Sequence, residues 1–249
     1  NSANFIMKKA FFISDVHLGV ESQQRERLKT EKLDKFFNTV EKEGEQLFIL
    51  GDFFDFWFDY RSVIFADYFQ VLCKLKRVAE SGTKIHIFGG NHDWWFSKKG
   101  FFSKKLNAEI YNNPAVVEIF GKKFFLAHGD GIAPSDRGYR WLLKPILRNP
   151  ISIWLFGLLP AELGRILARI TSSGSKLYTE KRNLSFEREY EEFAHEKLRQ
   201  DTDFVIMGHL HIPTVIKFEE GTYINSGDFY KNFSYVEFDG YELMLKKIE

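Results

Sequence analysis

Residues 84–93 read Lys84-Ile-His-Ile-Phe-Gly-Gly-Asn-His-Asp93, a short apolar stretch that runs into a cluster of polar side chains. The apolar part predicts a buried strand, and Asn91, His92 and Asp93 follow its carboxyl end. Ligand sites in α/β sheets gather at the carboxyl ends of strands. This stretch therefore indicates an α/β fold that carries a polar site along one edge of a sheet.

The same arrangement recurs at four other places in the chain. The apolar stretches cover residues 10–13, 46–50, 123–127 and 204–207, and the polar residues that follow them are Asp15 with His17, Asp52, His128, and His209 with His211. In each Asp-x-His or His-x-His pair the residues are two positions apart, and on an extended chain such residues point to the same side. If the strands are neighbours, all five clusters converge on one place.

The residue types in these clusters are those of a metal centre. They comprise two carboxylates, one amide and four imidazoles, with no sulfur: Asp15, Asp52, Asn91, His17, His128, His209 and His211. Taken singly, a histidine after a strand or a Gly-Asp pair is an ordinary surface or turn feature. Seven such donors exceed what one ion takes and suit two ions that share a carboxylate, an arrangement that serves phosphoester hydrolysis.

Helices are expected between the first strands. Residues 22–43 and 68–81 have helical spacing of apolar side chains, and Gly44 and Gly82 end them. The apolar face of the first helix is predicted to comprise Leu28, Leu33, Phe36, Phe37 and Val40. The single cysteine, Cys73, cannot form an internal disulfide, and we expect a buried thiol on the second helix and a reducing compartment.

Shorter strands are expected in the second half. Residues 108–111, 115–120 and 123–127 form three of them, with a hairpin turn at Gly121-Lys122. The tail from 214 to 248 alternates in polarity and is expected to form an antiparallel meander. Alternating helices and strands followed by a strand-rich half predict an α/β fold of two sheets packed face to face, with helices outside.

Composition limits the possible classes of protein. The chain has 249 residues, 44% hydrophobic and 28% charged, which is the balance of a folded globular domain. Its net charge of +1 gives no overall field for nucleic acid, so no nucleic-acid partner is expected. Met7 is expected to be the native start, with residues 1–6 a vector remnant or extension, and neither a signal peptide nor an apolar run long enough to span a membrane is visible.

Residues 132–191, which we call the insertion, differ from the core expected at 7–131 and 192–249. They are rich in apolar residues, and Pro145, Pro150 and Pro160 are expected to break them into short helices. Residues 137–182 contain nine Lys or Arg and two Asp or Glu, a formal charge of +7. A basic, tryptophan-containing helical lid suits an anionic amphiphile. The alternative is that these helices only bury their apolar faces on the core, with the arginines as a solvated rim.

The five polar clusters are similar to the signature of the calcineurin-like metallophosphoesterases. The matching blocks are Ser14-Asp15-Val16-His17-Leu18-Gly19, Gly51-Asp52-x-x-Asp55, Gly90-Asn91-His92-Asp93, His128-Gly129-Asp130 and Gly208-His209-Leu210-His211. The resemblance implies a four-layer αββα sandwich with two divalent ions. Mn²⁺ suits this donor set, and Fe or Zn are the alternatives.

The same resemblance implies a division of the ligands between the two ions. Asp15, His17, Asp52 and His211 would hold one ion, and Asp52, Asn91, His128 and His209 the other, with Asp52 bridging both. In the family at large, the position of His92 acts as a general acid or a transition-state stabiliser, and the following aspartate, here Asp93, orients it. The resemblance therefore implies that His92 and Asp93 are catalytic.

Within this family the chain resembles the branch that hydrolyses UDP-2,3-diacylglucosamine in lipid A biosynthesis. The resemblance rests on Gly51-Asp52-Phe53-Phe54-Asp55-Phe56-Trp57, on Asp136-Arg137-Gly138-Tyr139, and on residues 169–176. It implies water attack at the α-phosphorus, giving UMP and 2,3-diacylglucosamine 1-phosphate, at the cytoplasmic face of the inner membrane. The implied substrate contacts are Asn91, His92, Tyr139, Arg169, Lys176 and either Ser172 or Ser175.

One position departs from that branch, whose best-known members read Gly-Asn-Arg-Asp where this chain has Gly90-Asn91-His92-Asp93. Two alternatives therefore stay open. One is a related enzyme that acts on another phosphodiester or phosphomonoester, and the other is a non-enzymatic scaffold that has kept the fold. A scaffold of this kind usually loses metal ligands, and all seven are present here.

Overall fold

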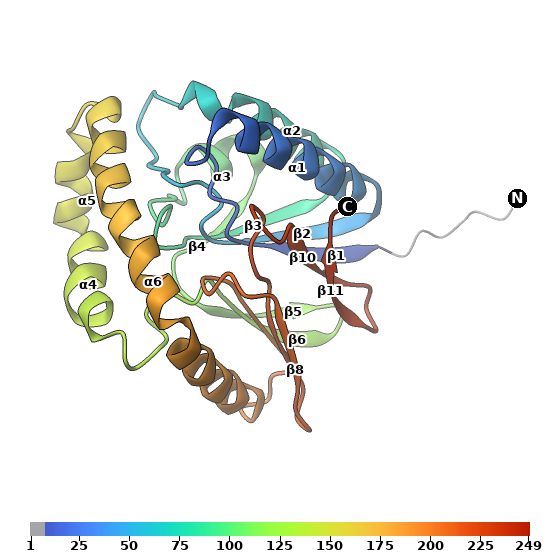
Figure 1. Ribbon diagram of the computed structural model, residues 1–249. Helices are drawn as coiled ribbons and strands as arrows, with labels where there is room; N and C mark the ends of the chain where they lie inside the picture. Colours follow the sequence, from blue (N-terminus) through green and yellow to red (C-terminus); the bar gives the residue numbers. More distant parts are fainter. Residues whose placement is uncertain (1–7) are drawn as a thin grey trace, which may run out of the picture.

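The structure is a computed structural model that describes residues 8–249, with the side chains of 171–185 left outside the description. The expected start at Met7 and the residues before it thus lie outside the described residues. The molecule has two β-sheets packed face to face, with helices on both outer faces (Figure 1).

The first sheet contains the strands that precede three of the five polar clusters. Its order is β11-β10-β1-β2-β3-β4, in which β1 to β4 are parallel and β10 and β11 are antiparallel additions. The bounds are β1 Lys9–Ile13, β2 Gly44–Leu50, β3 Lys84–Phe88, β4 Glu109–Tyr111, β10 Ser234–Phe238 and β11 Leu243–Lys247.

The second sheet contains the strands that precede the other two clusters. Its order is β5-β6-β7-β9-β8, and β6, β7 and β9 are parallel. The bounds are β5 Ala115–Ile119, β6 Lys122–Ala127, β7 Phe204–Met207, β8 Thr214–Lys217 and β9 Thr222–Asn225. Aromatic rings join the two sheets, since Phe12 of β1 stacks on Phe48 of β2 at 4.9 Å and on Phe124 of β6 at 5.7 Å between ring centroids.

Helices complete the four layers. Helices α1 (Gln23–Glu43) and α2 (Phe69–Glu80) cover the first sheet, and the C-terminal part of α6 (Ala161–Leu198) covers the second (Figure 1). The shorter helical segments are the 3₁₀ turn η1 (Ala66–Tyr68), α3 (Phe101–Leu106), the π-type turn η2 (Tyr139–Leu143), α4 (Lys144–Leu147) and α5 (Pro150–Gly157). The predicted α/β sandwich of two sheets and outer helices is confirmed.

The expected C-terminal meander is wrong. The tail forms two separate hairpins, because β8 and β9 belong to the second sheet whereas β10 and β11 extend the first. Alternating polarity predicts a strand, but it does not predict which sheet the strand joins. The hairpin turn before β6 is also shifted by one residue, to Phe120-Gly121, where both residues have positive φ (50° and 77°).

Two burial predictions are wrong for a common reason, which is the angular position of a residue around its helix. Cys73 is exposed. Helix residues are offset by about 100° each, so the buried Val71, Leu72 and Leu75 define a face that Cys73 does not share. Leu28 is likewise 44% exposed on α1, and the neighbouring Lys29 takes the buried position instead.

The insertion is broken at the three expected prolines, but its last helix is long rather than short. Its prolines lie at helix starts: Pro145 and Pro150 in the first turns of α4 and α5, and Pro160 immediately before α6. After Pro160 the chain forms one helix of 38 residues rather than several short ones. This helix passes the expected boundary at residue 191 and packs Phe186 and Tyr190 against the second sheet. No helix in the described part of the chain is both long enough and apolar enough to cross a bilayer.

Candidate metal centre

The seven predicted ligands lie together at the carboxyl ends of β1, β2, β3, β6 and β7. The backbone that places them is unusual, because five of the seven have left-handed φ values: Asp15 51°, His17 48°, Asp52 50°, His209 70° and His211 59°. Residues with side chains rarely adopt this region. The expectation that extended chain would align each pair is therefore wrong, since tight left-handed loops bring these side chains together.

One group of ligand atoms surrounds His17. Its Nε2 lies 3.3 Å from Nε2 of His211 and 3.7 Å from Oδ2 of Asp52. Nε2 of His211 in turn lies 3.1 Å from Oδ1 of Asp15. These four side chains could hold one cation, and they are the set that the family resemblance implies.

A second group surrounds His128. Its Nε2 lies 3.1 Å from Oδ1 of Asn91, 3.2 Å from Nδ1 of His209 and 3.4 Å from Oδ2 of Asp52. The same Asp52 oxygen therefore borders both groups, while its other oxygen accepts a 2.8 Å hydrogen bond from the backbone N–H of His92. Asp52 could therefore contribute to a cation site in either group.

The donor atoms fit divalent cations. Nδ1 of His128 lies 2.9 Å from the carbonyl oxygen of Leu50, which can only accept, so Nδ1 carries a proton and Nε2 is the nitrogen that faces the group. Oδ1 of Asp15 is buried and accepts no hydrogen bond from the residues that the structure describes. Buried acceptors that converge without donors are satisfied by a cation, and oxygen with imidazole nitrogen suits Mn²⁺, Fe or Zn.

Neighbouring charges shift one another's pKa values across the centre. Burial opposes ionisation of Asp52, but the imidazoles of His128 and His92 outweigh it and hold the pKa of Asp52 well below its usual value. Burial also disfavours charge on His128, yet Asp52 raises its pKa to about 10. Burial and the adjacent charge of His128 lower the pKa of His209 to about 4. Asp52 therefore stays ionised, which is the form of a carboxylate that binds a cation.

Asp93 has a structural role that the sequence did not indicate. Its carboxylate accepts hydrogen bonds from four backbone N–H groups: Gly90 at 2.9 Å, Asp52 at 3.0 Å, Phe53 at 2.8 Å and Phe54 at 3.1 Å. Asp93 therefore fixes the loop after β2 to the loop after β3. These four bonds use both oxygens of Asp93, and its orientation of the His92 ring stays a prediction.

The carboxylate that faces His92 is Asp55. Its Oδ1 lies 3.5 Å from Nδ1 of His92 and 3.9 Å from Nδ1 of His17. Asp55 is buried, and its carboxylate faces both His17, a candidate ligand, and His92, the candidate catalytic residue. The sequence contained this residue in Gly51-Asp52-x-x-Asp55, where spacing alone assigned it no partner.

Glycine is required where the loops after β2 and β3 meet. Gly51 has a φ of 88°, and a Cβ there would lie 2.7 Å from the backbone of Gly90 and from Nδ1 of His128. A Cβ at Gly90 would overlap the Asp52 carboxylate. These two glycines let the ligand loops approach each other at backbone distance.

Two further residues touch the centre and were not predicted. Tyr230 Oη lies 3.0 Å from Nδ1 of His211, so it can orient that ligand. Lys29 is buried on α1 and donates a 2.8 Å hydrogen bond to the carbonyl of His17. Tyr230 follows the end of β9, and that position at a further strand end is the signal that could have found it.

The predicted substrate contacts are only partly brought to the centre. Asn91 and His92 belong to it. Tyr139 instead donates a 2.7 Å hydrogen bond to Asp130, and Arg169 donates a 2.9 Å bond to the carbonyl of Gly19, in the loop that carries His17. The side chains of Ser172, Ser175 and Lys176 lie outside the described residues.

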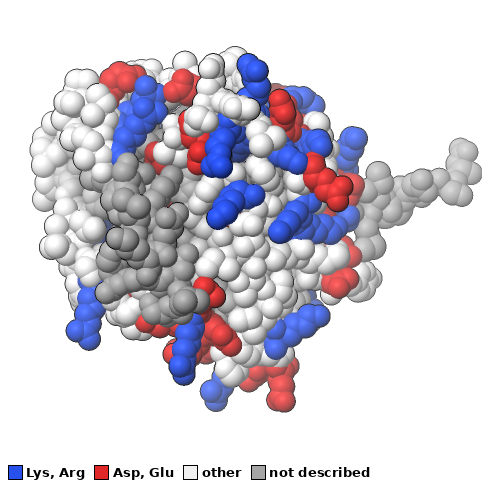
Figure 2. Space-filling model, in the orientation of Figure 1, with Lys and Arg blue, Asp and Glu red and all other residues white. Residues whose placement is uncertain are grey.

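The insertion presents a large apolar surface. Trp141 and Trp154 are 76% and 64% exposed, and exposed leucines and isoleucines surround them on α4, α5 and α6. In Figure 2 the left edge, where Figure 1 places α4 and α5, is mainly white, whereas acidic and basic side chains intermingle over α1 and α2. Apolar area of this kind is atypical of a free monomer surface and indicates a hydrophobic ligand or partner.

Comparison with known proteins agrees with this geometry. Residues 8–213 match the Calcineurin-like phosphoesterase family. The chain is 29% identical to the UDP-2,3-diacylglucosamine hydrolase of Porphyromonas gingivalis over 97% of this chain and 98% of that protein. It is 30% identical to the enzyme of that name from Pseudomonas putida, over 82% of each chain, and 29% identical to that of Haemophilus influenzae, over 92% of this chain and 93% of that one.

Proposed function

Because the chain belongs to the calcineurin-like phosphoesterase family and is a metal-dependent hydrolase, we propose that its substrate is UDP-2,3-diacylglucosamine. The pyrophosphate bond is cleaved, and the products are UMP and 2,3-diacylglucosamine 1-phosphate. The observation that carries this proposal is the exposed apolar surface of α4 to α6 beside a phosphoesterase centre. Relatives that cover most of the chain bear the name of this activity.

The reaction needs a centre that binds phosphate oxygens and activates water. When bound, two divalent ions supply both, by neutralising phosphate charge and lowering the pKa of water. Asp15, His17 and His211 would hold one ion, Asn91, His128 and His209 the other, and Asp52 would bridge them. Mn²⁺ is the ion we propose, because it suits this oxygen and nitrogen donor set.

His92 is proposed to stabilise phosphate charge. Its backbone N–H is fixed by Asp52, and its ring lies with Nε2 3.9 Å from Oδ2 of Asp52 and Nδ1 toward Asp55. A carboxylate on Nδ1 favours the imidazolium form. The leaving group of this reaction is a phosphate oxyanion, which needs little protonation, so charge stabilisation matters more than acid catalysis.

Residues 132–191 are proposed to act as a lid for the acyl chains and to lie on the membrane surface. Their exposed tryptophans and aliphatic side chains match acyl chains, and their excess of Lys and Arg matches anionic headgroups. The core of 7–131 and 192–249 would carry out the chemistry. The site of action that we propose is the cytoplasmic face of the inner membrane, with peripheral attachment, and the proposed substrate contacts from the insertion are Tyr139, Arg169, Ser172 or Ser175, and Lys176.

Hydrolysis of two diphosphates tests the proposal directly. With Mn²⁺ present, UMP release from UDP-2,3-diacylglucosamine should exceed release from UDP-N-acetylglucosamine, which has no acyl chains, by roughly 100-fold or more, because each buried methylene contributes about 0.8 kcal/mol. Bis(4-nitrophenyl) phosphate serves as a generic phosphodiester. A preference for the acyl-free or the generic compound would identify an enzyme with another substrate, and no turnover of any of them would identify a scaffold.

A further inference from the structure

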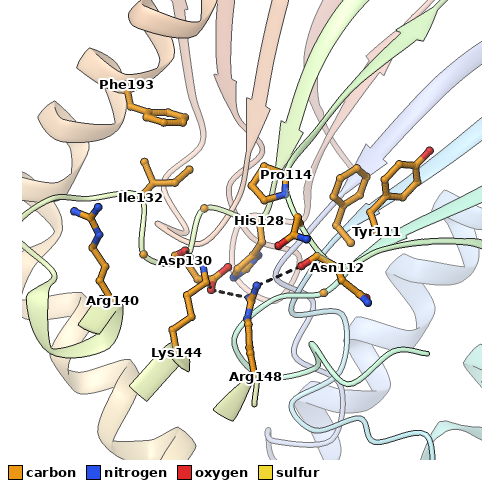
Figure 3. A pocket seen from close by; sticks show the side chains of 15 residues that line it. Tyr111, Asn112, Pro114, His128, Asp130, Ile132, Arg140, Lys144, Arg148 and Phe193 are labelled. Atoms are coloured by element: carbon orange, nitrogen blue, oxygen red, sulfur yellow. Dashed lines mark hydrogen bonds and ion pairs between the residues drawn. The ribbon is translucent and has the colours of Figure 1, made fainter. Parts of the chain in front are cut away.

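A cavity of about 260 Å³ adjoins the metal centre where the insertion meets the core. His128 forms part of its wall on the core side, together with Gly89 and the loop at Asn112 (Figure 3). On the other side the wall is made by Arg140, Lys144 and Arg148 of the insertion. A ligand in this cavity would therefore touch a candidate metal ligand and three cationic side chains.

The cavity is positively charged. Its described lining includes the three cations and one carboxylate, that of Asp130, which leaves a formal charge of +2. Asp130 Oδ2 pairs with Arg148 Nη2 at 2.9 Å and with Lys144 Nζ at 3.1 Å. One carboxylate thus organises two cations without neutralising both, an arrangement suited to an anionic ligand with several oxygens.

Arg148 is held in place independently of any ligand. Besides Asp130, its Nη1 donates a 3.4 Å bond to the carbonyl of Asn112, and its guanidinium lies 5.7 Å from the ring centroid of Trp94. Figure 3 shows this side chain between Asp130 and Asn112. Its Nε is buried and has no hydrogen-bond acceptor among the described residues, so one donor of a fixed guanidinium remains unused. A buried donor without an acceptor costs free energy, and a bound anion would recover that cost.

From this geometry we infer that the cavity takes the second phosphate of a diphosphate substrate, the phosphate that leaves with the lipid. The inference rests on the proposed function and deepens it. Water oxygen bonds to the α-phosphorus, the bond from that phosphorus to the bridging oxygen breaks, and the bridging oxygen keeps the electron pair within the departing phosphate. One proton of the water is released. Arg140, Lys144 and Arg148 would meet the charge that appears on the departing group.

The position of these cations supports this assignment over binding of an acyl chain or a base. All three lie in the insertion, which also presents the apolar surface, so a phosphate here would be continuous with a lipid lying on α4 to α6. An acyl chain would leave three cations and Asp130 desolvated without compensation. A cation cluster beside the metal centre also explains how a diphosphate could be preferred over a diester that carries a single phosphate.

Inhibition by UDP and UMP tests the inference without the lipid substrate. Both are titrated against hydrolysis of bis(4-nitrophenyl) phosphate at a fixed free Mn²⁺ concentration, and the ratio of their inhibition constants reports the second phosphate. UDP should inhibit the unaltered enzyme more strongly than UMP. In Arg148→Gln and Lys144→Gln this advantage should fall by about 10-fold or more, the value of a lost charge-assisted hydrogen bond.

Two further variants serve as an alternative test and as a control. Arg140→Gln removes a cavity cation that does not pair with Asp130. It replaces Arg148→Gln as the test variant if Arg148→Gln does not fold. Melting temperatures show whether each variant is folded. Arg137→Gln removes an exposed cation of the same segment that does not line the cavity, and it should keep the UDP advantage. An unchanged ratio in the folded cavity variants, or an equal loss in Arg137→Gln, would overturn the inference.

The outcome is separable from that of the proposed function. If the enzyme does not hydrolyse UDP-2,3-diacylglucosamine but the cavity variants lose the UDP advantage, the second-phosphate site stands and the lipid substrate is wrong. If the lipid is hydrolysed and the ratio does not change, the substrate stands and the cavity has been assigned wrongly.

Discussion

The strand ends bury charged side chains, whereas the insertion exposes large apolar ones. At the strand ends, charged side chains such as Asp15 and Asp52 are fully buried and bound by backbone N–H groups. In the insertion, large apolar side chains such as Trp141 and Trp154 are exposed. Both arrangements cost free energy in the isolated chain, and we expect a different ligand to relieve each cost, cations in the first case and an amphiphile in the second.

This contrast suggests that the strand ends carry out phosphoester hydrolysis and that the insertion selects the substrate. The buried centre is built from loops that fix one another, and we expect it to act on phosphoesters in general. We expect the exposed surface to determine which phosphoesters reach the centre. Changes at the centre should therefore reduce activity on every substrate, whereas changes on the insertion should affect the lipid substrate selectively.

The largest effect is expected from loss of the bridging carboxylate. Asp52→Asn and removal of metal by a chelator should each reduce kcat by about 10³-fold or more on both the lipid and bis(4-nitrophenyl) phosphate, because one atom of Asp52 borders both groups of ligands. Adding Mn²⁺ should restore the chelated enzyme but not the variant. Full turnover by a preparation shown by elemental analysis to be metal-free would disprove the dinuclear centre.

His92 is expected to show the next largest effect and to depend on the leaving group. His92→Ala should lower kcat by roughly 10- to 1000-fold on the diphosphate, as for loss of one charge-stabilising group. His92→Arg should retain substantial activity there, since it keeps the cation. The comparison is kcat of both variants on the diphosphate and on an alkyl phosphodiester. If Arg is no better than Ala on the diphosphate, His92 is a general acid.

Asp55 tests whether the second carboxylate behind the centre matters for every substrate. Asp55→Asn keeps the size of the side chain and removes the charge that faces His92 and His17, so kcat should fall by about 10- to 100-fold on lipid and generic substrates alike. Asp67→Asn, at an exposed aspartate of η1, is the control. Wild-type kcat in Asp55→Asn with normal metal content would remove Asp55 from the mechanism.

The smallest effect on chemistry is expected from the exposed tryptophans. Replacing both Trp141 and Trp154 by Ser should raise KM for the lipid by about 10- to 100-fold, given the free energy of burying such side chains, and leave bis(4-nitrophenyl) phosphate turnover unchanged. Binding to anionic vesicles should weaken in parallel, as measured by co-sedimentation. Tyr241→Ser, at an equally exposed aromatic residue on the β10–β11 turn, should change neither. Equal losses on both substrates would show that the tryptophans support the fold alone.

The sequence predicted which side chains form the site better than it predicted the backbone conformation that brings them together. Short motifs at strand ends picked out Asp15, His17 and the other side chains that the structure brings together, because residues that can bind an ion are of particular types at particular places. The backbone conformation was not predictable from spacing, since an Asp-x-His pair can converge either on an extended strand or in a left-handed loop. Asp55 and Tyr230 were missed because their partners come from distant parts of the chain, and only the packed fold brings them together.

The fold shows the same limit. The periodicity of β1 to β3 and of their helices was sufficient to predict a sandwich, since local patterning decides which face of an element is buried. The sheet to which β8 and β10 belong depends on long-range pairing that alternation does not encode. Cys73 was misplaced because a helix in an apolar stretch still has one outward side. The length of α6 was not predicted, because the three prolines mark where helices begin and no proline between residues 161 and 198 marks where the last one ends.

The left-handed ligand residues have a consequence for the amount of enzyme in a cell. Each such conformation costs about 1–3 kcal/mol unless surrounding contacts offset it. Five ligand residues adopt it: Asp15, His17, Asp52, His209 and His211. Cations that bind only the folded chain add stability by mass action. Chains made during metal scarcity should therefore unfold and be degraded faster than loaded ones. Metal supply would then set enzyme abundance as well as turnover, and glycine at these positions would give a longer-lived but inactive protein.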